Sequence, residues 1–170
     1  DIRGILNSSS KGGDVSITSG KFGSELTIET WVMPDRGGVV LEKEGLLSLK
    51  VGEIHEAAPI EFKIFLHNGV SLERHVISTG DHNGTRYVGN IYPLSTLNGM
   101  HDKNETDLNR NHRPLMQVVA SFNSGKIQIY VNGVLMAEKT LPNAEYRIPD
   151  NQNNLYIGGK GGKFRGVLES

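Results

Sequence analysis

The sequence has no cysteine, few aromatic residues and almost no excess of either charge. None of its 170 residues is Cys, aromatic residues make up 6%, and the formal net charge is −1. Without cysteine no disulfide can brace the fold, and such a net charge provides no basic field of the kind that attracts nucleic acid. No apolar run is long enough for a membrane-spanning helix. We therefore expect neither a nucleic-acid partner nor membrane insertion.

Glycine, in contrast, is abundant with 21 residues, and hydrophobic residues recur at every second position. This alternation predicts strands over residues 14–18, 25–32, 38–42, 47–51, 60–66, 70–78, 117–122, 126–131, 134–141, 155–157 and 164–168. Asn68-Gly69 and Asn132-Gly133 are the strongest hairpin signals between them. About a dozen short strands at this spacing are typical of a sandwich. The sequence predicts an all-β fold, a two-sheet antiparallel β-sandwich, and its length predicts one domain over residues 1–170.

One segment, Gly80 to Pro114, lacks this pattern. It is polar and rich in Asn, Asp, His and Gly, apart from a short apolar piece from Tyr87 to Leu97. Structureless segments of this length are uncommon in compact domains and are usually functional or disordered. We predict a long insertion loop here, with a strand of its own around residues 86–92. A decorated surface loop without a ligand is the alternative.

Four segments, in this order, resemble the laminin G-like family. Leu26 to Pro34 is similar to its FTIEAWVKP strand, and Val118 to Gly133 is similar to its HVVATFDGGKIYVNG hairpin. Residues 154–159 resemble its LYIGG strand, and residues 164–169 resemble the start of its closing FNGxIDEVRIYN strand. Along nearly its whole length the chain therefore resembles laminin G-like domains of the concanavalin A-like superfamily.

Three features depart from the pattern of this family. Leu115-Met116-Gln117 stands where the family has Trp-His, the segment from residue 80 to 114 is long, and the closing strand stops at Ser170. The first residue is Asp1, and we expect the chain to be part of a longer protein. The resemblance implies a jelly roll that binds glycans, cell-surface proteins or matrix, in some members with a calcium ion. A fold does not by itself fix a function.

Glycan recognition combines aromatic faces with polar groups. In the long loop we predict ligand-binding residues of both kinds, namely Asp81, Asn83, Arg86, Tyr87, Asn90 and Tyr92. Trp31, the single Trp of the chain, lies in a strand motif, and we expect it in the core together with Tyr130 and Tyr156.

Calcium takes several oxygen ligands from carboxylates, amides and backbone carbonyls. The long loop offers such oxygens at Asp102, Asn104 and Asp107. The resemblance implies a second arrangement, in which Asp14 and Glu169 share a structural calcium. Calcium is thus the expected ion, and solvated loop polarity without a metal is the alternative.

An enzyme on this fold would place two carboxylates around a glycosidic bond. Glu25 and Glu29 alternate along one strand with Thr27 between them, but Glu29 also belongs to the strand motif of the resembling family. We therefore predict a non-enzymatic recognition module, extracellular or on a cell or virion surface. It would bind a glycan or a cell-surface or matrix protein through its rim loops, with calcium assistance. The alternatives are a structural or assembly module of a viral or surface protein, and a glycan-cleaving enzyme.

Overall fold

The computed structural model describes residues 23–52, 60–79, 116–142 and 145–158, and also four short strand segments. In those segments and at residues 33–37 it describes the backbone alone. The described residues form twelve strands: β1 (Ile5–Leu6), β2 (Asp14–Val15), β3 (Glu25–Lys43), β4 (Leu47–Val51), β5 (Ile60–His67), β6 (Leu72–Ser78), β7 (Arg86–Tyr87), β8 (Met116–Asn123), β9 (Lys126–Val131), β10 (Val134–Thr140), β11 (Leu155–Ile157) and β12 (Arg165–Glu169). None of these residues belongs to a helix of the length and apolarity needed to cross a membrane.

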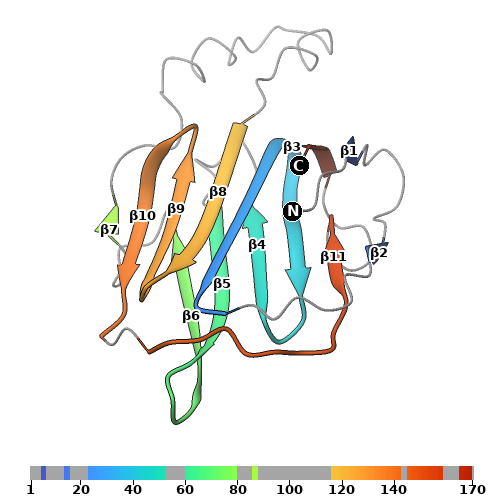
Figure 1. The fold of residues 1–170 in the computed structure, drawn as a ribbon. Helices are drawn as coiled ribbons and strands as arrows, with labels where there is room; N and C mark the ends of the chain where they lie inside the picture. The colour runs from blue at the N-terminus through green and yellow to red at the C-terminus, as the bar shows by residue number, and fades with distance from the viewer. Residues whose placement is uncertain are drawn as a thin grey trace, which may run out of the picture.

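The strands form two antiparallel sheets that pack face to face (Figure 1). The front sheet has the order β1-β12-β3-β8-β9-β10-β7. The back sheet has the order β6-β5-β4-β3-β11-β2. This arrangement confirms the predicted two-sheet antiparallel sandwich.

Strand β3 belongs to both sheets, which corrects the prediction of two separate strands at 25–32 and 38–42. Its first half pairs with β8 in the front sheet, and its second half pairs with β4 in the back sheet. The register shifts opposite residues 34–37 and again between Val39 and Leu41, and Gly38 has a φ of 130°. Register shifts of this kind bend a strand, and glycine tolerates the positive φ. The chain therefore turns from one layer into the other without leaving the strand.

Tight turns join the paired strands where the sequence predicted hairpins. Between β9 and β10, Asn132 and Gly133 have φ values of 50° and 79°; between β8 and β9, Ser124 and Gly125 have 48° and 77°. Two central residues with positive φ are the signature of the type I′ turn, which suits the twist of the strands. In the β5–β6 hairpin only Gly69, with a φ of 95°, has this conformation.

The inner faces of both sheets form one hydrophobic core. Strands β5 and β8 alternate buried and partly exposed residues along most of their length, as the two-residue period requires. The largest fully buried side chains include Phe62 from the back sheet and Phe122 from the front sheet. The segment between β10 and β11 crosses one end of the sandwich (Figure 1) and buries Leu141, Tyr146 and Ile148.

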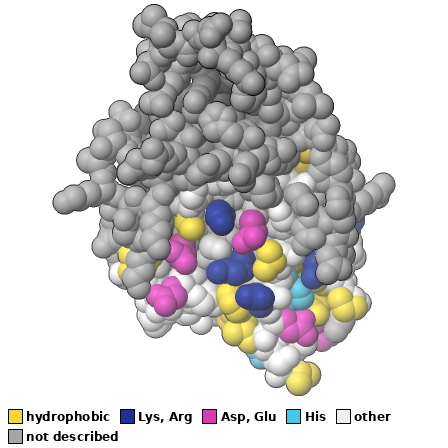
Figure 2. All heavy atoms as spheres, turned by 180° about the vertical axis from the view of Figure 1, so that it is seen from behind, with side chains coloured by type: hydrophobic (Ala, Val, Ile, Leu, Met, Phe, Trp, Pro, Cys, Tyr) yellow, Lys and Arg dark blue, Asp and Glu magenta, His cyan; other side chains and the backbone are white. Residues whose placement is uncertain are grey.

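The outer face of the back sheet mixes charges of both signs. Lys50 on β4 lies directly opposite Glu61 on β5. Figure 2 views the molecule from this side, where basic, acidic and hydrophobic side chains are interspersed. Because neighbouring charges of opposite sign offset one another, the described part of this face has no field of one sign, and we assign it no role.

Candidate binding site

Trp31 stands on the outer face of the front sheet, with 40% of its surface exposed. The expectation that it lies in the core is wrong. Side chains alternate across a strand, and on β3 the inward positions are held by Thr30 and Val32, which are 6% and 0% exposed. Trp31 therefore shares the outward face with Glu29. A large aromatic side chain in water is the informative exception to normal burial.

Polar side chains surround Trp31 on the neighbouring strand and turn. Gln117 on β8 lies directly opposite Trp31, and its Nε2 donates a 2.6 Å hydrogen bond to Glu29 Oε1. The backbone N–H of Gln117 donates to Asn132 Oδ1 at 3.0 Å, and that of Asn132 donates to the Gln117 carbonyl at 2.9 Å. These bonds hold the β9–β10 turn against the start of β8, so that amide and carboxylate groups lie beside the indole.

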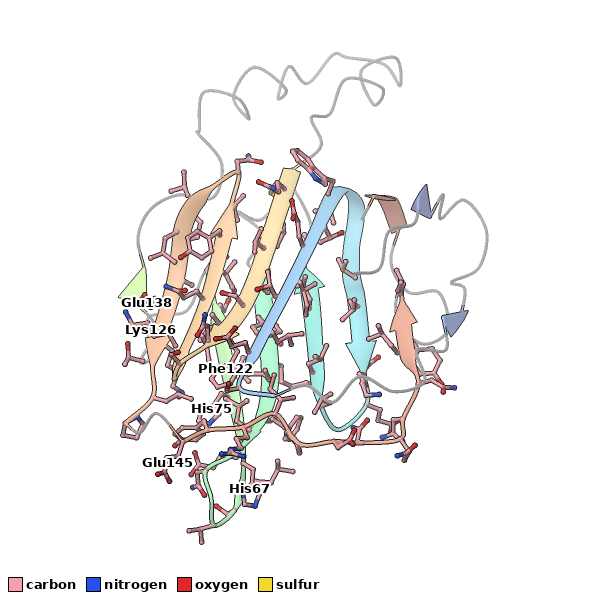
Figure 3. All side chains as sticks on the ribbon, viewed as in Figure 1. His67, His75, Phe122, Lys126, Glu138 and Glu145 are labelled. Atoms are coloured by element: carbon pink, nitrogen blue, oxygen red, sulfur yellow. The ribbon has the colours of Figure 1, made fainter. Side chains whose placement is uncertain are left out.

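The outer face continues across β9 and β10. Val119 and Tyr130 are opposite one another and half-buried, which corrects the expectation that Tyr130 lies in the core. In the next row, Gln128 Nε2 donates to Glu138 Oε2 at 2.7 Å (Figure 3 labels Glu138). From the spacing between strands and the rise along them, the Cα atoms of Trp31 and Tyr130 lie about 12 Å apart. The face thus carries two aromatic side chains among hydrogen-bonding amides and carboxylates.

The predicted long loop joins the sheet beside this face. The chain resumes its described course at Met116, which is opposite Val32, one position from the Trp31–Gln117 pair. Within the loop, Arg86 and Tyr87 form β7, which lies at the edge of the front sheet opposite Glu138 and Ala137. This short strand agrees with the expectation of a strand beginning near residue 86. The other predicted ligand-binding residues, Asp81, Asn83, Asn90 and Tyr92, lie outside the described residues.

The predicted calcium ligands are placed by backbone alone or not at all. Asp102, Asn104 and Asp107 lie outside the described residues. Asp14 is on β2 in the back sheet, opposite Tyr156. Glu169 is on β12 in the front sheet, with its backbone opposite Trp31. Among side chains that the structure describes, no three of His, Asp or Glu converge as a metal site would require.

The two residues considered for glycan cleavage, Glu25 and Glu29, lie on the same face of β3. Glu25, Thr27 and Glu29 all occupy outward positions of this strand. Four residues of extended chain separate the Cα atoms of Glu25 and Glu29 by about 13 Å. A catalytic pair needs carboxyl groups about 5–10 Å apart, and Glu29 already accepts the hydrogen bond from Gln117. Hydrolysis by this pair would require the two side chains to lean towards each other and Glu29 to release Gln117.

A polar cluster lies where the β5–β6 hairpin meets the crossing segment. Tyr146 Oη donates to Glu73 Oε2 at 2.9 Å, and Asn68 Nδ2 donates to Glu73 Oε1 at 2.6 Å. These bonds, chiefly the one from Tyr146, hold the pKa of Glu73 below its ordinary value. His75 is buried, with Nε2 3.3 Å from Glu73 Oε2 but without a hydrogen bond. Burial, with a smaller effect of the Lys139 charge, lowers the pKa of His75.

Comparison with known proteins yields similar folds only. No protein-family model matches the chain, and no curated protein matches it. Among solved structures, the LG1–3 region of the laminin α2 chain has 9% identity and a TM-score of 0.47 over 94% of this chain, which spans 24% of that structure. The CBM40 of the Ruminococcus gnavus IT-sialidase has 10% identity and the same TM-score, with 94% and 87% covered. Domains LG4–5 of the mouse laminin α1 chain have 12% identity and a TM-score of 0.41; the chain covers 40% of them.

Proposed function

We propose that this chain is a non-enzymatic recognition module that binds a glycan on the outer face of its front sheet. The observation that carries the proposal is the exposed indole of Trp31 beside a hydrogen-bonded pair, Gln117 and Glu29. The same chemistry would suit a glycosylated cell-surface or matrix protein, because its sugars would be the contact. We propose accordingly that the module acts outside the cell or on a surface.

The chemistry of the face fits a sugar better than an apolar ligand. A pyranose offers C–H groups on its faces, which pack on an aromatic ring, and hydroxyl groups at its rim, which need donors and acceptors. Trp31 offers the ring, since a Trp is a large, rigid contact surface with little side-chain freedom to lose. Glu29 and Gln117 offer acceptors and donors that are already held in place by their mutual hydrogen bond. Preorganised polar groups fix the orientation of a ligand.

The long loop is part of the proposal because its end lies beside Trp31, and calcium is part of it as the ion that would order the loop. Residues 80–114 lead into β8 one residue before Gln117, so a ligand on Trp31 would be within reach of the loop's end. In the proposed complex, Asp81, Asn83 and other loop residues add contacts at this rim. Arg86, on β7 at the far edge of the front sheet, would contact a ligand that extends across the whole face. Calcium, held by the acidic loop residues, would order the loop. This arrangement predicts that chelation weakens binding without abolishing the contribution of Trp31.

The test is a glycan-array screen of the wild type, with calcium and with a chelator, followed by titration of each hit. Trp31→Ala should weaken binding of the best hit by about 2 kcal/mol or more, as for a central aromatic contact. Leu72→Ala is the matched control, because Leu72 is also an exposed apolar residue, at 52%, but lies on the β5–β6 hairpin. It should leave the affinity unchanged.

Two results would contradict the proposal. One is a glycan that binds equally well to wild type and to folded Trp31→Ala. The other is an array without any hit in either condition, which would favour the structural or assembly role. Hydrolysis of an array glycan would favour the enzyme hypothesis, and its loss in a Glu29→Gln variant that still binds the glycan would assign the reaction.

A further inference from the structure

The tip of the β5–β6 hairpin holds an Asn-Gly pair in an unusual set of contacts. The hairpin projects beyond the body of the sandwich (Figure 1). Its turn begins at Asn68, whose backbone N–H donates to the Ser71 carbonyl at 3.0 Å. Gly69 follows with a φ of 95°, and Val70 at the tip is 91% exposed. The Asn68 side chain is folded back over this turn.

The amide oxygen of Asn68 is held by two backbone donors. The N–H groups of Val70 and Ser71 each donate to Oδ1 at 2.8 Å. Two fixed N–H groups aimed at one carbonyl oxygen form the arrangement that stabilises a developing oxyanion during acyl transfer. The amide carbon of Asn68 is therefore polarised towards attack.

A nucleophile and a base are present at the same turn. The backbone N–H of Gly69 donates to His67 Nδ1 at 3.0 Å, within the reach that a general base needs. His67 is exposed and labelled in Figure 3. On the leaving-group side, Asn68 Nδ2 donates to Glu73 Oε1 at 2.6 Å. Base, oxyanion donors and a hydrogen-bonded leaving group thus surround one side-chain amide.

We propose that Asn68 is a site of self-catalysed deamidation. The Gly69 N–H gives its proton to His67 Nδ1 while its nitrogen forms a bond to Asn68 Cγ. The oxyanion on Oδ1 collapses, the Cγ–Nδ2 bond breaks, and Nδ2 takes a proton back from the imidazolium and leaves as ammonia. The product is a five-membered succinimide, which a solvent water opens to aspartate or isoaspartate.

The conversion would alter the polar cluster below the turn. The side-chain amide donates to Glu73 in the native chain, but a carboxylate at position 68 would repel Glu73. Glu73 also accepts the bond from Tyr146, whose segment closes one end of the sandwich. The reaction would therefore weaken the contact between the hairpin tip and that segment, and this change would accumulate as the protein ages.

Asn132-Gly133 is an internal comparison with the same two residues. Here Asn132 lies inside the turn with a φ of 50°, and its Oδ1 accepts from Gln117 on the neighbouring strand. Its amide is thus directed across the sheet and away from the following glycine. The structure predicts that Asn68 reacts faster than Asn132.

The experiment is timed incubation of the folded protein at neutral pH, then trypsin digestion and mass spectrometry. Cleavage after Lys63 and Arg74 gives a peptide, residues 64–74, in which Asn68 is the only side-chain amide. Cleavage after Lys126 and Lys139 gives residues 127–139 with Asn132. Conversion of Asn68 should exceed that of Asn132, and His67→Ala should slow it about a hundredfold while leaving Asn132 unchanged.

The unfolded chain separates catalysis by the turn from intrinsic Asn-Gly reactivity. In denaturant both sites should react at similar rates, and folding should accelerate Asn68. A folded rate at or below the rate in denaturant would overturn the proposal, because the turn would then protect the amide. An unchanged rate of Asn68 deamidation in folded His67→Ala would show that His67 is not the base, and it would also overturn the proposal. Asn68→Asp, the product mimic, should lower the Tm.

Discussion

At the residue scale, His75 is a titratable side chain whose burial opposes its protonation. Burial and the positive charge of Lys139 outweigh the nearby Glu73 carboxylate, so the pKa of His75 lies below its ordinary value. The unfolded chain then binds a proton at a pH where the folded chain does not. A group of this kind contributes stability that is complete above its unfolded pKa and is lost as the pH falls towards its folded pKa.

The free energy of unfolding should accordingly fall as the pH drops below about 6.5, the ordinary value for His. Glu73, whose pKa is also lowered, adds a loss in the same direction, but only at lower pH. The His75 ring meets the Tyr146 ring edge-to-face, with the centroids 5.5 Å apart. His75→Phe keeps this ring contact and should flatten the upper part of the profile. Denaturant melts of wild type and His75→Phe at a series of pH values measure it. An identical profile for His75→Phe would exclude His75 as the cause.

For Trp31, the sequence predicted the strand correctly but not the exposure of the side chain. The motif in which it lies was assigned correctly to a strand, but similarity to a family motif suggested burial. Strict alternation along β3 predicts the exposure of Trp31 correctly. Leu26 and Ile28 pack inward, so position 31 lies on the outward face with Glu25 and Glu29. The hydrogen bond between Gln117 and Glu29 joins residues 88 positions apart, and register alone brings them together. No local pattern specifies such a pair.

At the element scale, the β9–β10 hairpin depends on a backbone conformation that favours glycine. Gly133 has a φ of 79°, and a Cβ at this position would meet nothing within 4 Å. Gly133→Ala should therefore lower the free energy of unfolding by about 1–2 kcal/mol through backbone strain alone. Gly23 is the matched control, since it also has open space but no positive φ. Gly23→Ala should be neutral or slightly stabilising, and equal losses in both variants would contradict the turn assignment.

Strand β3 shows why element boundaries were harder to predict than element types. Pro34 and the Gly37-Gly38 pair interrupt the alternation, and such residues normally end a strand. Here they coincide with register shifts opposite β12 and β4, so the chain bends and continues. The choice between an ended strand and a bent one depends on partners distant in sequence. The hairpins were predictable because Asn-Gly acts locally.

At the scale of the whole molecule, the shared strand and the single core join the two sheets of the sandwich. β3 carries Trp31 in the front sheet and pairs with β4 in the back sheet. Ile64 on β5 and Ile129 on β9 are both fully buried, one in each sheet. A substitution that destabilises either sheet should therefore lower the unfolding midpoint of both sheets.

Ile64→Val and Ile129→Val should each lower the free energy of unfolding by about 0.5–1.5 kcal/mol. The fluorescence of Trp31, the only Trp, reports on the front sheet, and far-ultraviolet circular dichroism reports on all strands. If the sheets unfold together, Ile64→Val in the back sheet should shift the fluorescence midpoint as far as the dichroism midpoint. If it shifted the dichroism signal and left Trp31 fluorescence in place, the two sheets would unfold separately. The rigid platform required for glycan binding at Trp31 would then depend on the front sheet alone.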